Sequence, residues 1–244
     1  SEDEDIIKLR KKFIKKGDVH SHPEWRNVEC AMSSTRRVVK IAERYNKKIH
    51  VLHVTTKEEV DFLAMHKKNV TFETTPQHLT LYAPDCYDKL GTYAQMNPPL
   101  RSKEHYDRLW VAIKNNIVDV LGSDLAPHLK VNKDKEYPET PSGIPGVQTI
   151  FPVMIDHVNN GKLTLTQLIN LMCENPCRIF GIKNKGFIKE GFDADLTIVD
   201  MDKEVIIKNE MIASKCGWTP FHNYKVKGFP VGTIVNGILV MSNG

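Results

Sequence analysis

The segment VDVLGSDLAPH (118–128) places polar side chains directly after an apolar run. Asp124 follows Val120, Leu121 and two small residues, and His128 comes four residues later. Gly, Ser, Asp and Pro are ordinary turn residues, so a strand that runs into a turn is one interpretation. The other is that Asp124 lies at the carboxyl end of a parallel strand, where α/β barrels carry their catalytic groups. The rest of the sequence has to decide between the two.

Two further apolar segments also lead into polar side chains. One contains His53, and the next contains Glu73 and then His78. Because the carboxyl ends of parallel barrel strands meet at one mouth, His53 and Asp124 are expected to lie close together. A neutral imidazole and a carboxylate suit a divalent ion such as Zn²⁺, whose bound water becomes a nucleophile near neutral pH. A catalytic zinc usually has three protein ligands, so further ligands are needed.

The other histidines are weaker candidates. His20 and His22 are two positions apart, which on a strand would place them on one face, but charged residues precede them and Pro23 follows. A surface loop is therefore expected there. His50 is expected to face away from His53, because their separation on a strand is odd. The remaining ones are interpreted as surface or structural residues: His66, His105, His157 and His222.

Two loops rich in Pro or Gly could contact a substrate. In QMNPPLRS (95–102), two prolines fix the backbone around Asn97 and Arg101, whose donors suit a substrate amide or carboxylate. A rigid loop before a helix is the plainer interpretation. In TPSGIPGVQT (140–149), backbone N–H groups in front of a helix could meet an anionic or carbonyl group.

The elements that must position these residues alternate between helix and strand. Helical spacing of apolar residues predicts helices over 28–45, 57–67 and 102–116. Apolar runs between them predict strands over 47–56, 69–79 and 117–124. This alternation is typical of parallel β/α units, in either a barrel or a doubly wound sheet.

The pattern of the sequence changes from helical to β near residue 182. Residues 147–182 are predicted to be helical, and short β runs separated by turn residues follow, including the hairpin signal Asn236-Gly237. We therefore expect an α/β domain over 1–182 and a small β-domain segment over 183–244.

The composition is that of a globular protein. The 244 residues are 41% hydrophobic and 26% charged, and the net charge of +4 arises from interspersed acidic and basic residues. No nucleic-acid footprint, membrane span or signal peptide is expected. The five cysteines lack metal-site pairing. Cys173 and Cys177, four apart in a predicted helix, are expected to be buried reduced thiols, which indicates the cytoplasm.

Seven motifs occur in the order found in the cyclic amidohydrolases, and the chain most resembles the dihydroorotases of that superfamily. The motifs are HVLHVTT, ETTPQHL, NPPLRS, GSDLAPH, SGIPGVQT, NPCRIFG and GFIKEGFDADLTIVD. The resemblance covers nearly all of residues 1–244. It implies a metal-dependent (β/α)8 TIM-type barrel with an appended small β-domain. The implied reaction is the reversible closure of N-carbamoyl-aspartate to dihydroorotate, a step in pyrimidine biosynthesis.

Residue by residue, the resemblance implies a role for each candidate. His53 matches the metal-binding histidine at the end of barrel strand six. Asp124 matches the strand-eight aspartate, which binds metal and acts as the general acid/base. Asn97, His128 and the Ser142-Gly143 backbone match substrate contacts.

The resemblance further implies that this chain is the C-terminal part of a dihydroorotase-like protein, covering barrel strands six to eight and part of the β-domain. The opening Ser-Glu-Asp looks like the tail of a His-Ser-Glu-Asp motif on strand five. The remaining ligands of one or two zinc ions are therefore expected upstream of Ser1, and the fragment alone is expected to be inactive. The expected partners are the small-molecule substrate, the upstream half of the same protein and further copies in a homo-oligomer.

The chain departs from the family pattern at one position, and two alternative functions are considered beside dihydroorotase. Leu125 stands where the family usually has His, which loosens the surroundings of Asp124. Hydantoinase, dihydropyrimidinase and allantoinase share the scaffold and mechanism, although NPPLR, APH and PGVQT together favour dihydroorotase. A non-catalytic homologue that acts as a scaffold for another pyrimidine enzyme is the second alternative, and retention of the candidate site residues argues against it.

Overall fold

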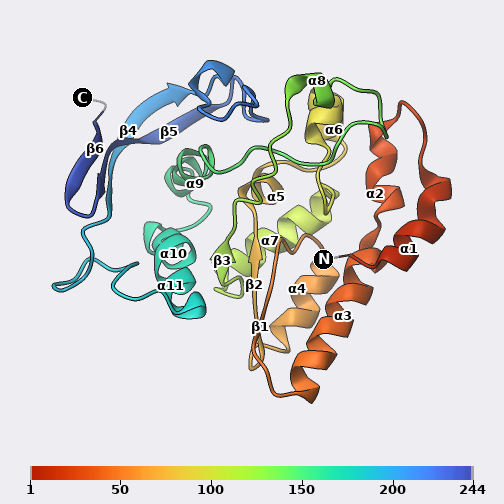
Figure 1. The fold of residues 1–244 in the computed structure, drawn as a ribbon, viewed down its shortest axis with the longest axis horizontal. Coiled ribbons are helices and arrows are strands. Elements are labelled where there is room, and N and C mark those ends of the chain that lie inside the picture. The colour runs from red at the N-terminus through yellow and green to blue at the C-terminus, as the bar shows by residue number, and fades with distance from the viewer. Residues whose placement is uncertain (1, 243–244) are drawn as a thin grey trace.

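A parallel three-stranded sheet lies at the centre of the computed structural model, which describes residues 2–242. The strand order is β1 (Ile49–Val51), β2 (Val70–Thr74) and β3 (Val120–Leu121). Three helices cover one side of this sheet, as Figure 1 shows: α3 (Val28–Arg44), α4 (Lys57–Ala64) and α7 (Lys103–Lys114). The predicted alternation of helices and parallel strands is confirmed, with strands shorter than predicted.

The main core lies between this sheet and its helices. Val51 and Phe72 on the strands are buried against Leu63 of α4 and Ile113 of α7. Each fully buried side chain of this size contributes roughly 1.5–3 kcal/mol. The packing therefore holds the carboxyl ends of the three strands at a common edge.

One predicted strand is wrong in part. Residues 69–79 were expected to be extended throughout, but β2 ends at Thr74 and the helix α5 (Pro76–Thr80) begins at once. The side chain of Thr75 accepts a hydrogen bond from the amide of His78, and Pro76 occupies the first turn, where its missing N–H costs nothing. These two residues start the helix.

Short helices surround the site loops and the beginning of the described chain. They are α1 (Glu4–Leu9), α2 (His22–Trp25), α6 (Asp85–Leu90) and α8 (Lys130–Lys133), with 3-10 turns at Arg10–Phe13, Val19–Ser21, Gly91–Ala94 and Asn209–Met211. No helix within residues 2–242 is long and apolar enough to cross a bilayer.

The predicted helical region 147–182 consists of separate helices. They are α9 (Ile150–Asn159), α10 (Leu165–Ile169), a π-helical turn (Asn170–Glu174) and α11 (Asn175–Phe180). The break before α10 arises because Thr164 and Gln167 form a capping box that starts a new helix. Cys173 is exposed and Cys177 half-buried, so the expectation of buried thiols is wrong there. In that turn Leu171 faces the core instead.

A second, antiparallel sheet follows in the order β4 (Leu196–Ile206), β5 (Lys225–Val235) and β6 (Ile238–Ser242). It packs on α9 (Figure 1), where β5 comes so close that a Cβ on Gly228 would lie 2.1 Å from the Ile155 side chain. The predicted hairpin is confirmed, since Asn236 and Gly237 connect β5 to β6 with φ values of 49° and 77°. The domain boundary at residue 182 stays a prediction.

Candidate active site

His53 lies two residues beyond the end of β1, with a left-handed φ of 39°. Such values are rare for residues other than Gly and concentrate at functional sites. Burial lowers the pKa of His53 to about 4, so the ring is neutral near pH 7. Within residues 2–242, its Nδ1 atom is buried and has no hydrogen-bond partner. A buried neutral nitrogen with a free lone pair is suited to a metal ion.

Asp124 lies three residues beyond the end of β3. It has a left-handed φ of 43° and is half-buried. Burial raises the pKa of its carboxyl group, and the nearby charge of Glu73 raises it further. The same edge of the sheet thus carries two functional candidates in the same uncommon backbone conformation.

Glu73 on β2 connects the two electrostatically. Its charge raises the pKa of Asp124 and opposes the effect of burial on the pKa of His53. Its Oε2 atom lies 3.2 Å from Nε2 of His50. A Cβ at position 122 would lie 2.3 Å from Glu73 Oε1, so only Gly122 leaves room for this carboxylate. Glu73 therefore lies near both His53 and Asp124, and the close approach of His53 to Asp124 stays a prediction.

The metal prediction concerns His53 and Asp124. In the part of the chain that the structure describes, no group of three or more His, Cys, Asp or Glu side chains could hold a metal ion. The unpartnered Nδ1 of His53 and the half-buried carboxylate of Asp124 nevertheless fit two of the ligands that a divalent ion needs.

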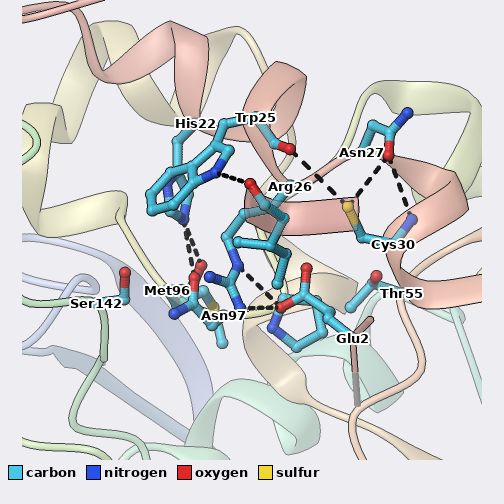
Figure 2. Close-up of polar contacts among 12 residues, drawn as sticks. Glu2, His22, Trp25, Arg26, Asn27, Cys30, Thr55, Met96, Asn97 and Ser142 are labelled. Carbon is cyan, nitrogen blue, oxygen red and sulfur yellow. Dashed lines mark hydrogen bonds and ion pairs between the residues drawn. The ribbon is translucent and has the colours of Figure 1, made fainter. Parts of the chain in front are cut away.

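Asn97 is oriented by a residue that was expected on the surface. His22 is fully buried, which makes the surface-loop prediction wrong for this residue, whereas His20 beside it is about 43% exposed. Nε2 of His22 lies 3.0 Å from both Oδ1 of Asn97 and the carbonyl oxygen of Met96, as Figure 2 shows. Both partners are acceptors, so Nε2 carries the hydrogen. Burial lowers the pKa of His22 to about 3, which keeps the ring neutral.

His128, Ser142 and Gly143 are also brought together. The His128 Nε2–H donates to the carbonyl oxygen of Ser142 at 3.1 Å. The Gly143 N–H, expected to be open to a substrate, donates instead to the carbonyl oxygen of Gln95 at 2.9 Å, so this part of the expectation is wrong. Gly143 has a φ of 149°, and a Cβ there would lie 2.9 Å from His128 Nε2. Close packing of the loops leaves room only for Gly.

The comparisons with known proteins agree with this geometry. Residues 2–240 match the amidohydrolase family. The chain belongs to this family. It is 35% identical over 225 residues to the dihydroorotase of Halobacterium salinarum, covering 92% of this chain and 52% of the relative. It is 38% identical over 224 residues to the dihydroorotase of Pyrococcus furiosus, covering 91% and 52% of the two chains.

Solved amidohydrolase structures have the same fold. The L-hydantoinase (dihydropyrimidinase) from Arthrobacter aurescens superposes with a TM-score of 0.96 at 30% identity, covering 100% of this chain and 56% of that one. The dihydropyrimidinase from Brevibacillus agri gives 0.89 at 25% identity, covering 98% and 55%. The fold is therefore of the α/β TIM-barrel type, and the chain spans about half the length of the relatives it matches.

Arg101 forms hydrogen bonds within the fold. It is 5% exposed, and its guanidinium donates to the carbonyl oxygen of Arg26 at 2.6 Å and to the Thr55 hydroxyl at 3.4 Å. The charge of Glu2 partly offsets the effect of burial on its pKa. Among residues 2–242, Nη2 of Arg101 is buried without a hydrogen-bond partner, so both Asn97 and Arg101 keep a donor for a ligand.

The other buried histidines have protein partners. His78 Nδ1 lies 2.8 Å from the Thr75 hydroxyl and its Nε2 lies 3.2 Å from the carbonyl oxygen of Pro98. His157 Nε2 lies 2.9 Å from the Thr80 hydroxyl oxygen. Burial lowers the pKa of His78 to about 3 and that of His157 to about 4. The structural interpretation of His157 is confirmed.

Three residues near the amidohydrolase loops were missed from the sequence: His22, Gln95 and Lys133. His22 and Lys133 stand among charged residues, which is a signal for exposure. Gln95 gave no signal in the sequence, because it is a loop residue before the Asn-Pro-Pro motif. Leu125, the departure from the family pattern, is 47% exposed, forms a bridge to Ile144 and lines a cavity of about 300 Å³.

Proposed function

We propose that this chain is the C-terminal part of a dihydroorotase-like cyclic amidohydrolase, with β1, β2 and β3 as barrel strands six to eight. The observation that carries the proposal is the buried Nδ1 of His53, which has no hydrogen-bond partner among residues 2–242, at the edge that also holds Asp124. Identities of 35–38% to dihydroorotases of two organisms support dihydroorotate as the substrate.

The remaining parts of the site would come from a preceding segment of the same protein. The curated relatives are about twice as long as this chain, which covers 52% of the first of them. Both β1 and β3 are edge strands of the described sheet, and a closed barrel leaves no edge. His53 and Asp124 would hold one or two zinc ions together with ligands from that segment. When bound, zinc supplies a Lewis acid and an activated water near neutral pH.

Asp124 would move the proton in the reaction. Hydrolysis adds water to a ring carbonyl, breaks the adjacent C–N bond and returns a proton to the leaving nitrogen. The half-buried carboxylate of Asp124 takes the first proton and supplies the second. The raised pKa brings this group closer to the operating pH, which favours general acid/base catalysis.

Asn97 and His128 would bind the substrate. Oδ1 of Asn97 is engaged by His22, so the Nδ2 amide remains as a donor to a carbonyl or carboxylate. His128 donates through Nε2 to Ser142, so its Nδ1 would remain as an acceptor for the substrate.

The proposal is tested with the purified full-length protein and four cyclic amides: dihydroorotate, hydantoin, dihydrouracil and allantoin. We expect kcat/KM for dihydroorotate to exceed the others by at least about a hundredfold, because a site built for one polar group rejects analogues that lack it. A preference for hydantoin or dihydrouracil would support the second candidate, a hydantoinase, which is suggested by the TM-score of 0.96 to the L-hydantoinase from Arthrobacter aurescens. A metal-loaded protein that opens none of the four would support the non-catalytic scaffold.

We further propose that the protein acts in the cytoplasm as a homo-oligomer.

A further inference from the structure

Lys133 carries a fully buried ammonium group that has no counter-ion among residues 2–242. It ends α8 and is 0% exposed. Its Nζ donates to the carbonyl oxygens of Gln95 at 3.1 Å and Pro141 at 3.0 Å, and it lies 5.7 Å from the centroid of the Trp218 ring. No charged group among the described residues contributes to the pKa of Lys133. Burial lowers the pKa of Lys133 to about 8. Neutral carbonyls compensate a buried charge only in part, so this arrangement costs stability.

The two carbonyl groups belong to the two loops that carry the substrate contacts. Gln95 precedes Asn97 by two positions, and Pro141 precedes Ser142 directly. The carbonyl oxygen of Gln95 also accepts from the Gly143 N–H at 2.9 Å. The Gln95 side chain donates to the Ser142 hydroxyl at 3.0 Å. The ammonium therefore joins both loops at the point where they already meet.

The backbone of Lys133 makes the same connection. Its carbonyl oxygen accepts from the Thr92 hydroxyl at 2.7 Å and from the Thr140 hydroxyl at 3.3 Å. Thr92 lies before the first loop and Thr140 lies in the second. The main chain of Lys133 thus contacts the second loop and the turn that leads into the first.

The segment that carries His128 also contacts the residues around Lys133. Nε2 of His128 donates to the Ser142 carbonyl oxygen, and the indole N–H of Trp218 donates to the His128 carbonyl oxygen at 2.7 Å. Trp218 is also the ring that lies against the ammonium. The three substrate-binding segments therefore have Lys133 and its contacts in common.

We propose that Lys133 is a positioning residue that sets the geometry of the substrate-binding loops by hydrogen bonding to Gln95 and Pro141. This inference rests on the proposed function of the loops. Replacing a buried charge by an apolar side chain of similar size is often neutral or stabilising. Lys133 therefore acts on substrate binding, at a cost to the stability of the fold.

The test compares Lys133→Met with Lys130→Met in the full-length, metal-loaded enzyme. Met matches the length of Lys without its donors, and Lys130 is an exposed lysine on the same helix. For Lys133→Met we expect KM for dihydroorotate to rise about tenfold, from the loss of charge-assisted hydrogen bonds, with kcat changed less than about threefold. Metal content should stay unchanged and Tm should be equal or higher. Lys130→Met should match the wild type.

Hydrogen exchange at the Gly143 amide provides a measurement independent of turnover. This amide donates to the carbonyl oxygen that Lys133 also binds, so its exchange should be at least about tenfold faster in Lys133→Met and unaltered in Lys130→Met. If the wild-type enzyme hydrolyses none of the cyclic amides, the proposed function is wrong. The exchange rate of the Gly143 amide still tests the contact between Lys133 and the loops in that case. An unchanged KM, unchanged exchange, or a Lys133→Met protein that fails to fold or melts lower would assign Lys133 to the fold alone.

Discussion

The Nε2–H of His22 lies 3.0 Å from Oδ1 of Asn97, although 75 positions separate the two residues. The same nitrogen contacts the carbonyl oxygen of Met96, and the Tyr137 hydroxyl lies 3.5 Å from Nδ1. Because the oxygen of the Asn97 amide is engaged, its NH2 group is what remains to donate to a ligand. A buried neutral histidine thus orients the amide of Asn97, the proposed substrate contact.

His22 should affect substrate binding through Asn97. His22→Leu removes the donor and leaves the amide free to flip, so KM of the full-length enzyme should rise about tenfold, while His22→Gln, which keeps an N–H donor, should recover part of the loss. Steady-state kinetics of both variants measure this. His20→Gln, at the half-exposed neighbour, is the control and should leave KM unchanged. Equal KM values for the Leu and Gln variants would contradict the orienting role.

Asp124→Asn should nearly abolish turnover. An amide can neither accept a proton nor return it to the leaving nitrogen, and loss of a general acid/base lowers kcat on the order of 10²–10⁴-fold. Asp107→Asn on the exposed face of α7 is a matched control and should keep the wild-type rate. If Asp124→Asn keeps more than about a tenth of kcat with its metal content unchanged, the acid/base role is wrong.

Metal analysis should separate ligands from substrate contacts. His53→Ala should lose bound metal together with activity, because it removes the unpartnered Nδ1 donor. Asn97→Ala and His128→Ala should keep the metal and lower kcat/KM about ten- to a hundredfold. Atomic absorption on the three purified proteins measures their metal content and separates the two roles. Depletion in either of the latter two, or full occupancy in His53→Ala, would reverse the assignment.

Acid should destabilise the protein partly through His157. Burial lowers its pKa to about 4 from an ordinary value of 6.5. As the pH falls below 6.5, the unfolded chain takes up a proton that the folded protein does not, so stability is lost between about pH 6.5 and 4. This contribution amounts to about 3 kcal/mol in full. His157→Gln should therefore show a shallower fall of Tm over this range. An identical slope in variant and wild type would exclude the contribution.

Residues 1–244 expressed alone should aggregate or stay loosely packed. The edges of β1 and β3 are open in the described sheet, and open edges pair with other chains. Co-expression with the preceding half of the protein should give a soluble, cooperatively unfolding product, measured by light scattering and thermal denaturation. A monodisperse isolated fragment with one sharp transition would contradict this expectation.

The sequence by itself determined the features that depend on local pattern. Apolar spacing predicted α3, α4 and α7, and apolar runs predicted the strands that end near His53 and Asp124. Parallel strands align their carboxyl ends, so polar residues after them had to meet at one edge. The ordered motifs then identified the family, because each motif is contiguous in the chain.

Only the tertiary structure decided which polar groups are buried and what they contact. His22 and Lys133 stand among charged residues that predict exposure, yet both are 0% exposed. The Gly143 amide was expected to be free, but Gln95, 48 positions earlier, accepts its hydrogen bond. Burial of a polar group depends on partners that compensate its lost hydration, and these partners come from distant segments. Local periodicity carries no information about them, so the residues that support the two candidate loops became visible only in the folded chain.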